Sequence, residues 1–196
     1  LPGNGGIAAD AVCVPEIGVK DIDKIVDFAR SHAIDFAVVA PDDPLALGCV
    51  DRLHEAGIPC FGPDAKAARI EASKAFSKNL MKKYGIPTAR YEVFDDPDAA
   101  LNYLRSPGVS FPIVIKADGL ALGKGVLIPQ GLREAEFSVR IIMEEGAFGD
   151  SGSRIVIEEF LTGPEVSVLA FTDGTAIVPM VSSMDHKRAG DGDTGL

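Results

Sequence analysis

The sequence lacks any long apolar run, and basic residues are outnumbered by acidic ones. No stretch reaches the roughly 18 apolar residues of a membrane helix, and the first nine residues lack the basic and then apolar order of a secretory signal. These absences predict a cytoplasmic protein with no membrane partner. With 19 Lys and Arg against 29 Asp and Glu, the formal net charge is -10, which argues against sequence-independent binding of nucleic acid.

Cysteines are also few, and they form no recognisable pattern. Cys13, Cys49 and Cys60 are odd in number, lie in apolar stretches, and show neither a CxxC motif nor a Cys/His ligand spacing. We therefore expect buried, reduced thiols. Hydrophobic residues make up 46% of the 196 positions, enough for a substantial core in a globular protein.

Residues 1–63 alternate short apolar runs with helical periods, which is typical of a parallel sheet with crossover helices. We expect a helix capped by Asp21, a buried strand over 35–40, a helix from about 44 to 56, and a further strand. The strand, glycine turn and helix that normally open such a sheet are not visible, because the first residues have the composition of a loop. A partial Rossmann-like domain in a chain truncated at its start is therefore expected.

The rest of the chain divides into three expected parts. Residues 64–87 are linker helices that begin the next region, with Ser73 as a helix cap. Residues 88–160 alternate strands and helices as a small α+β lid subdomain. Residues 161–196 begin an incomplete subdomain with an antiparallel hairpin.

The strongest local signal is a strand, a glycine-rich loop and a returning strand around Lys116 and Lys124. Glycines let backbone N–H groups approach phosphate oxygens closely, and the lysines add positive charge. The spacing differs from a Walker P-loop, because three residues separate Gly119 from Gly123 and because Gly125 stands where Ser or Thr would bind magnesium. A mobile hairpin turn with solvated lysines is the alternative for this feature alone.

A second signal is the carboxylate pair Glu158 and Glu159 at the end of an apolar strand, where a purely structural sheet would favour Val or Ile. Backbone groups near Phe160 and Leu161 can read a purine edge, and a carboxylate can accept hydrogen bonds from its amine or from ribose hydroxyls. Surface carboxylates at a strand end would give the same pattern.

Together these motifs resemble the ATP-grasp fold, in which two subdomains close on ATP. Their order resembles the phosphoribosylamine-glycine ligase family along essentially the whole chain. The motifs are Gly62-Pro63, Ser73-Lys74-Ala75-Phe76, Lys116-Ala117-Asp118-Gly119-Leu120-Ala121, Glu158-Glu159-Phe160-Leu161 and Asp185-His186-Lys187-Arg188. The second motif and the segment 185–195 are the most specific to this family.

The resemblance implies a carbon-nitrogen ligase of purine biosynthesis that uses ATP and Mg²⁺ and joins glycine to 5-phosphoribosylamine through a glycyl phosphate. The ATP-binding residues it implies are Lys74, Lys116, Asp118, Gly119, Gly123, Lys124, Gly125, Glu158, Glu159, Phe160, Leu161 and Glu165. The substrate-binding residues it implies are Asp185, His186, Lys187, Arg188, Asp191, Asp193 and Thr194. Lys116 and Lys187 are the catalytic candidates. His186 is either a hydrogen-bonding residue or a general base.

Other interpretations stay open. The family's magnesium ligands are expected outside this segment, so the chain alone is expected to lack full activity, and a monomer is favoured. Asp42 stands where the family often has Glu, as a substrate-side carboxylate or a helix cap. The alternatives are another ATP-grasp carboxylate-amine ligase, a non-catalytic nucleotide-binding fragment, and a dinucleotide-dependent oxidoreductase. The last would need a glycine fingerprint that the chain does not show.

Overall fold

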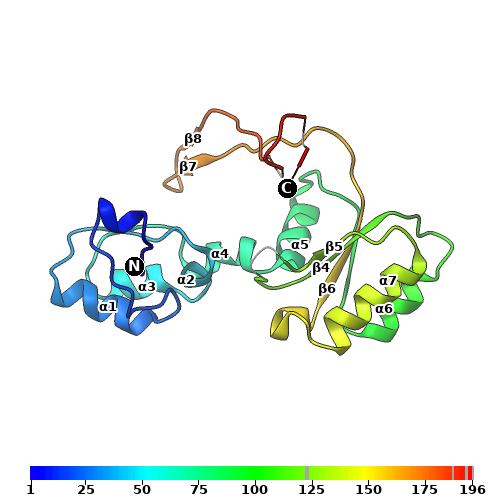
Figure 1. The fold of residues 1–196 in the computed structure, drawn as a ribbon, viewed down its shortest axis with the longest axis horizontal. Coiled ribbons are helices and arrows are strands. Elements are labelled where there is room, and N and C mark those ends of the chain that lie inside the picture. Colours follow the sequence, from blue (N-terminus) through cyan, green and yellow to red (C-terminus); the bar gives the residue numbers. More distant parts are fainter. Residues whose placement is uncertain (122–123, 187, 193, 196) are drawn as a thin grey trace. The chain divides into compact units, whose positions relative to one another are not determined.

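The computed structural model divides the chain into two compact units, Leu1–Phe160 and Leu161–Leu196 (Figure 1). It describes residues 1–121, 124–186, 188–192 and 194–195. The first unit combines a parallel strand pair and helices with a four-stranded antiparallel sheet, which confirms the expected α/β fold class. Among the described residues, no helix has the length and apolar character needed to span a membrane.

The first unit contains most of the regular structure. Its helices are α1 (Ile22–Ser31), α2 (Asp42–Ala46), α3 (Cys49–Glu55), α4 (Ala65–Ala72), α5 (Lys74–Tyr84), α6 (Pro97–Leu104) and α7 (Leu132–Val139). Shorter helical turns are η1 (Ile7–Ala9), η2 (Arg140–Glu144) and η3 (Gly149–Gly152). Its strands are β1 (Ala37–Val38), β2 (Cys60–Phe61), β3 (Tyr91–Phe94), β4 (Ile113–Ala117), β5 (Val126–Leu127) and β6 (Ile155–Glu159).

The amino-terminal part has a small core beside the parallel pair β1 and β2. Val26 of α1 and Cys49, Val50 and Leu53 of α3 are buried there, so the two helices bury apolar faces against the strands. Cys49 is a free thiol whose pKa is raised, first by burial and then by Cys60. The expectation of buried thiols holds for Cys49, whereas Cys13 and Cys60 are only half-buried.

Two expectations for this part were wrong. The helix expected from 44 to 56 is two helices, because Gly48 adopts a left-handed conformation with φ of 78° and separates α2 from α3. The buried strand expected over 35–40 is the two-residue β1, in which Val38 is exposed. Apolar side chains alone did not distinguish an exposed strand from a buried one.

Helix α5 begins as the sequence predicts, after the cap residue Ser73. The Oγ atom of Ser73 accepts a hydrogen bond from Phe76 N at 3.1 Å, which caps the first turn. Gly85 ends the helix in a left-handed conformation with φ of 66°. The cap and the stop therefore fix the two ends of α5.

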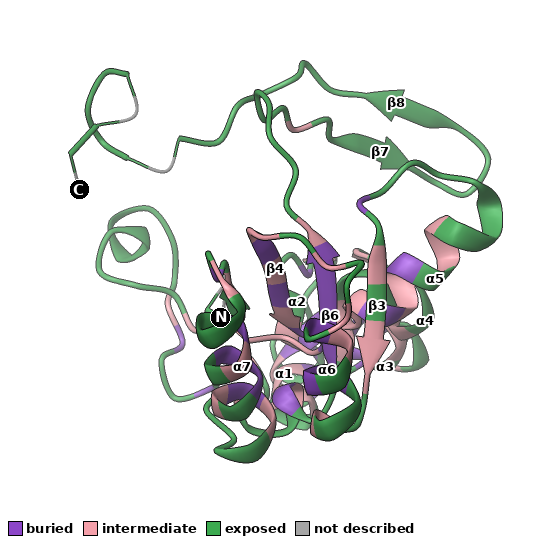
Figure 2. Ribbon diagram, turned by 90° about the vertical axis from the view of Figure 1, so that its right-hand side faces the viewer, coloured by how far each residue is buried: buried purple, intermediate pink, exposed green. Residues whose placement is uncertain are grey.

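The antiparallel sheet has the strand order β3-β6-β4-β5. Alternate residues of β4 and β6 are fully buried in one core with α6 and α7, namely Ile115, Ala117 and Ile155, together with Ile113 and Ile157. The opposite face of the sheet meets α5 (Figure 1). Figure 2 shows the burial of β4 and β6, which makes this sheet a firm support for side chains on its α5 side.

The second unit contains one antiparallel hairpin, formed by β7 (Ala170–Thr172) and β8 (Ile177–Pro179), which confirms the expected hairpin. Asp173 accepts backbone hydrogen bonds from Ala176 and Thr175 in the turn, and these bonds lower its carboxyl pKa. Both strands are exposed (Figure 2). The finer domain boundaries expected from the sequence stay a prediction.

Candidate functional site

A cluster of charged side chains lies between the sheet and α5. Glu158 comes from β6, Lys116 from β4 and Lys78 from α5. In the antiparallel register Lys116 faces Val156 and Glu158 faces Val114, so the lysine and the glutamate share one face of the sheet. The structure thus brings together two of the predicted residues, Lys116 and Glu158.

The carboxylate of Glu158 is almost fully enclosed, with 5% of its side chain exposed. Its Oε2 atom lies 2.9 Å from Lys78 Nζ, and its Oε1 atom lies 3.1 Å from Lys116 Nζ. The second contact is an ion pair without hydrogen-bond geometry, and Oε1 accepts no hydrogen bond from the described residues. A buried acceptor without a hydrogen bond is costly, so the Lys116 ion pair is the described compensation for Oε1.

Lys78 is a member of this cluster that the sequence motifs did not indicate. Its Nζ atom also donates to Thr88 Oγ1 at 2.8 Å and lies 5.7 Å from the centre of the Tyr91 ring. Tyr91 in turn donates from its hydroxyl to Asn79 of α5 at 2.9 Å. The available signal was its position four residues after Lys74, which places both lysines on one side of the helix.

Asp118 joins the end of β4 to the start of α5. Its Oδ1 atom accepts from Ala75 N at 2.7 Å, and its carboxylate also accepts from Ser73 Oγ at 3.1 Å. A carboxylate beside the first N–H groups of a helix is favourable for both hydrogen bonding and the helix dipole. Arg154 lies 3.7 Å from the same carboxylate. The structure therefore shows Asp118 binding the helix start.

Lys74 lies at this junction and points to the glycine-rich segment. Its Nζ atom donates to Gly119 O at 2.9 Å, and its backbone N donates to Asp118 O at 3.1 Å. Burial lowers the pKa of Lys74, and the nearby carboxylates of Asp118 and Glu71 oppose that shift. The side chain is therefore a partly desolvated cation held beside the backbone of the loop.

A cavity of about 510 Å³ lies beside Lys74. Leu120 and Gly125 of the glycine-rich segment line it, together with Asp42 and Asp43 at the start of α2. Asp43 also forms an ion pair with Lys20 at 3.1 Å. Asp42 lines the cavity as the first residue of α2, but the cap position is Pro41 and no side chain accepts a capping hydrogen bond there, so the helix-cap role expected for Asp42 was wrong.

Two glycines of the loop are required by packing inside the protein. A Cβ atom on Gly119 would lie 2.6 Å from Ser151 Oγ, and one on Gly125 would lie 2.7 Å from the Cβ atom of Ala121. Close approach to a ligand was the expected reason for these glycines, whereas their described neighbours are protein atoms. Gly123 lies outside the described residues, and Lys124 is exposed on the same segment.

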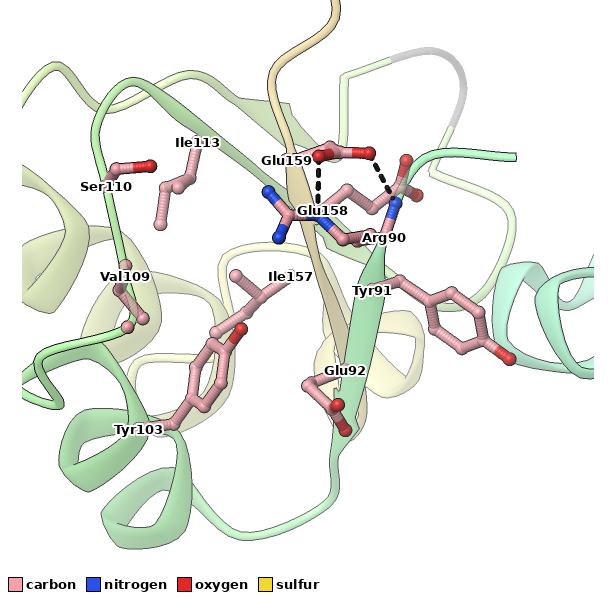
Figure 3. Close-up of a pocket in the computed structure, with 11 residues that line it drawn as sticks. Arg90, Tyr91, Glu92, Tyr103, Val109, Ser110, Ile113, Ile157, Glu158 and Glu159 are labelled. Atoms are coloured by element: carbon pink, nitrogen blue, oxygen red, sulfur yellow. Dashed lines mark hydrogen bonds and ion pairs between the residues drawn. The ribbon is translucent and has the colours of Figure 1, made fainter. Parts of the chain in front are cut away.

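Glu159 lies apart from this cluster. Its Oε1 atom accepts from Arg90 N at 2.8 Å, and its Oε2 atom accepts from Arg90 Nε at 2.7 Å (Figure 3). The backbone hydrogen bond, followed by the side-chain one, lowers the carboxyl pKa. Ile113, its partner in the register, belongs to the core on the α6 side. The structure therefore does not bring Glu159 to Lys116.

The pocket of Figure 3, with a volume of about 240 Å³, lies near this end of β6. Tyr103 and Ser110 line it together with Arg90 and Glu159. The Tyr103 pKa is raised, chiefly by burial and then by the Glu92 carboxylate. In the same view the ring of Tyr91 points away from that of Tyr103, although Tyr91 and Glu158 also line this pocket.

The remaining predicted residues occupy other positions. Phe160 ends the first unit and is exposed. The second unit contains the predicted residues Leu161, Glu165, Asp185, His186, Arg188, Asp191 and Thr194. A hydrogen bond from Thr194 Oγ1 to Asp191 O at 2.9 Å closes a turn that contains the last two. Lys187 and Asp193 lie outside the described residues.

The described part of the chain shows no cluster of candidate metal ligands. No group of three or more His, Cys, Asp or Glu side chains there could hold a metal ion. The enclosed carboxylate of Glu158 is occupied by two lysines, which is the opposite of what a divalent cation requires. The Glu158 carboxylate is therefore a poor ligand for a divalent cation while both lysines contact it.

A partial parallel sheet followed by an antiparallel sheet that presents lysines beside a glycine-rich segment is the arrangement of the ATP-grasp class. The family model for the phosphoribosylglycinamide synthetase ATP-grasp (A) domain matches residues 72–196, and the model for the N domain of the same synthetase matches residues 1–71. The chain belongs to the phosphoribosylglycinamide synthetase family.

Individual relatives agree with this family. A phosphoribosylamine-glycine ligase of Xanthomonas campestris is 53% identical over 99% of this chain, which spans 45% of that relative. The crystal structure of a phosphoribosylamine-glycine ligase from Thermotoga maritima is 38% identical, with a TM-score of 0.77 over 100% of this chain and 46% of that one. The biotin carboxylase domain of a Hydrogenobacter thermophilus 2-oxoglutarate carboxylase shares the fold at 20% identity and a TM-score of 0.71, over 85% and 39% of the two chains. The chain therefore spans less than half of the length of these relatives.

Proposed function

We propose that this chain supplies an ATP-binding face to a phosphoribosylamine-glycine ligase of purine biosynthesis. In this reaction the γ-phosphoryl group of ATP passes to the carboxylate of glycine, and the amine of 5-phosphoribosylamine attacks the resulting glycyl phosphate. Phosphate leaves, and glycinamide ribonucleotide is formed. The structural observation that carries the proposal is Lys116, a partly exposed cation beside an enclosed carboxylate whose Oε1 atom lacks a hydrogen bond.

The lysines provide the phosphate-binding part of the proposal. Lys74 and Lys116 would contact phosphate oxygens and stabilise the negative charge of a loose phosphoryl-transfer transition state. The segment from Asp118 to Gly125 would cover them, and its closure would keep water from the acyl phosphate. Lys124, exposed on this segment, would add a further positive charge.

The nucleoside part of ATP would bind at the end of β6. Backbone groups near Phe160 and Leu161 would contact adenine, Glu158 would accept from its amine, and Glu165 would bind ribose hydroxyls. Because Arg90 holds the Glu159 carboxylate, the proposal includes Glu159 only through its backbone.

The segment from Asp185 to Gly195 is assigned to the substrates. Contacts to glycine or 5-phosphoribosylamine would come from Asp185, His186, Arg188, Asp191, Asp193 and Thr194. Lys187 would neutralise the negative charge that develops during phosphoryl transfer. Mg²⁺, which would bridge the phosphates in such a reaction, would need ligands beyond the described residues. A cytoplasmic location and a monomeric state stay predictions.

Phosphate release by the full-length natural protein that carries this chain tests the proposal. We expect ATP-dependent release with glycine and 5-phosphoribosylamine together, and loss of that release when either is omitted. Equal release with D-alanine in place of glycine would contradict the assignment and favour another ATP-grasp carboxylate-amine ligase. Calorimetric binding of ATP with no release under any condition would identify a non-catalytic nucleotide-binding protein.

A further inference from the structure

Lys78 is an enclosed lysine that has no role in the proposed chemistry. Only 9% of its side chain is exposed, and its Nζ atom has two close partners, Glu158 Oε2 at 2.9 Å and Thr88 Oγ1 at 2.8 Å. A buried ammonium group with a carboxylate and a hydroxyl at these distances is held in one position. Lys78 is therefore a fixed component of the cluster.

The charges of the cluster do not cancel. Two lysines meet one carboxylate, and Lys78 already neutralises Glu158 through the shorter contact. Lys116 is the surplus cation, with 28% of its side chain exposed and a contact to Glu158 that lacks hydrogen-bond geometry. The cluster thus contains one firmly held ammonium group and one loosely held ammonium group.

We infer that Lys78 is a positioning residue that neutralises Glu158 and so leaves Lys116 free to move from that carboxylate to a phosphate group. Without Lys78, Glu158 would be an enclosed charge whose described counterion is Lys116. Phosphate would then compete with a carboxylate for the same ammonium group, because an unpaired buried charge is costly. The inference rests on the proposed function and assigns Lys78 no contact with substrate.

Binding of separate parts of ATP to the 196-residue chain tests this role. We expect Lys78→Met to weaken the binding of inorganic tripolyphosphate on the order of tenfold, the value of one charged contact, and to weaken adenosine binding much less, because the Glu158 carboxylate assigned to the adenine amine is still present. Lys82→Met removes the same charge from an exposed position on the same helix and serves as the matched control. Equal loss for tripolyphosphate and adenosine would show a merely structural role and overturn the inference.

A second substitution distinguishes competition from misfolding. In the double variant Lys78→Met with Glu158→Gln, no carboxylate competes for Lys116, so tripolyphosphate affinity should return to within about threefold of the wild type, a factor worth less than one charged hydrogen bond. If Lys78→Met alone does not fold, Glu158→Gln alone carries the test, and it should bind tripolyphosphate at least as tightly as the wild type. Weaker binding by Glu158→Gln would overturn the inference.

The reactivity of Lys116 gives a measurement that does not depend on nucleotide binding. We expect reductive methylation, followed by mass spectrometry, to label Lys116 more slowly in Lys78→Met than in the wild type or in Lys82→Met, because its amine is then held by Glu158. If the wild type binds no ATP, the proposed function fails while this measurement still decides the role of Lys78. Equal labelling of Lys116 in all three proteins would overturn that role.

Discussion

Glu158 and Glu159 are adjacent in the sequence but lie in opposite environments. Glu158 has 5% of its side chain exposed and meets two lysines, whereas Glu159 has 32% exposed and pairs with Arg90, whose side chain is 85% exposed. The ion-pair distances are similar, 2.9 Å for Lys78 with Glu158 and 2.7 Å for Arg90 with Glu159. Strand alternation places the two carboxylates on different faces of β6.

The comparison shows that burial, and not distance, separates these ion pairs in energy. An exposed pair gains little because water screens it and the side chains lose freedom. A buried pair is costly to assemble, and removing one member leaves an uncompensated charge. The two faces of one strand should therefore respond very differently to the same substitution.

The largest expected effect is on stability, from Glu158→Ala. Removing this carboxylate leaves Lys78 enclosed without its counterion, so we expect a loss of about 3–5 kcal/mol in the free energy of unfolding. Urea denaturation of the chain measures it. Glu159→Ala is the matched control on the next residue and should cost much less. Similar losses for the two variants would contradict the comparison.

The next effect concerns ligand binding. Lys116→Ala should lower ATP affinity on the order of tenfold or more, as expected for a lost charged contact. Stability should change little, because Lys78 still neutralises Glu158. Calorimetric titration measures the affinity, with Arg90→Ala as the control on the other face. An unchanged affinity for ATP in Lys116→Ala would remove its phosphate role.

A smaller expected effect is a pH dependence of ATP affinity that arises from Lys74 at the start of α5. Burial lowers the pKa of Lys74, and a bound phosphate would raise it again because an anion favours the charged lysine. ATP affinity should therefore fall as pH rises through the lowered pKa, and binding in that range should take up a proton. Calorimetry in two buffers of different ionisation enthalpy measures this uptake.

Lys74→Arg is the control for that pH dependence. An arginine stays protonated throughout the range, so the proton uptake should disappear while ATP still binds. Uptake that persists in Lys74→Arg would assign the proton to another group.

The smallest expected effect is on the exposed pair. Because hydrogen bonds from Arg90 lower the pKa of Glu159, its stabilising contribution is present above the ordinary glutamate pKa. The contribution is lost as pH falls through the lowered pKa. Thermal unfolding of the wild type and of Glu159→Gln should differ slightly at pH 7 and converge in acid. A difference that grows in acid would contradict the assigned sign.

The sequence predicted the boundaries of elements where capping residues fix them. Ser73 caps α5 as expected by accepting from Phe76 N, whereas Asp21 stands at the start of α1 without a side-chain cap hydrogen bond. The break at Gly48 was missed, because an isolated glycine within a helical pattern does not state its φ angle.

The residues of the candidate site were likewise predicted only in part from the sequence. Lys74, Lys116 and Glu158 belong to the sequence motifs from which nucleotide binding was predicted, and the structure places Lys116 beside Glu158. Motifs could not separate Glu158 from Glu159, since the facing direction of a strand residue depends on register. Lys78 was missed because its role depends on a partner 80 residues later in the chain.

Helix α5 sets a distance within the site. Lys74 and Lys78 are one helical turn apart, and their amines reach Gly119 beyond the end of β4 and Glu158 on β6. The rise of about 5.4 Å per turn is therefore a fixed spacer between the loop and the enclosed carboxylate. One residue inserted between the two lysines would rotate the second by about 100° and remove it from the sheet. The length of a single turn is thus a constraint on the sequence, independent of which side chains fill the turn.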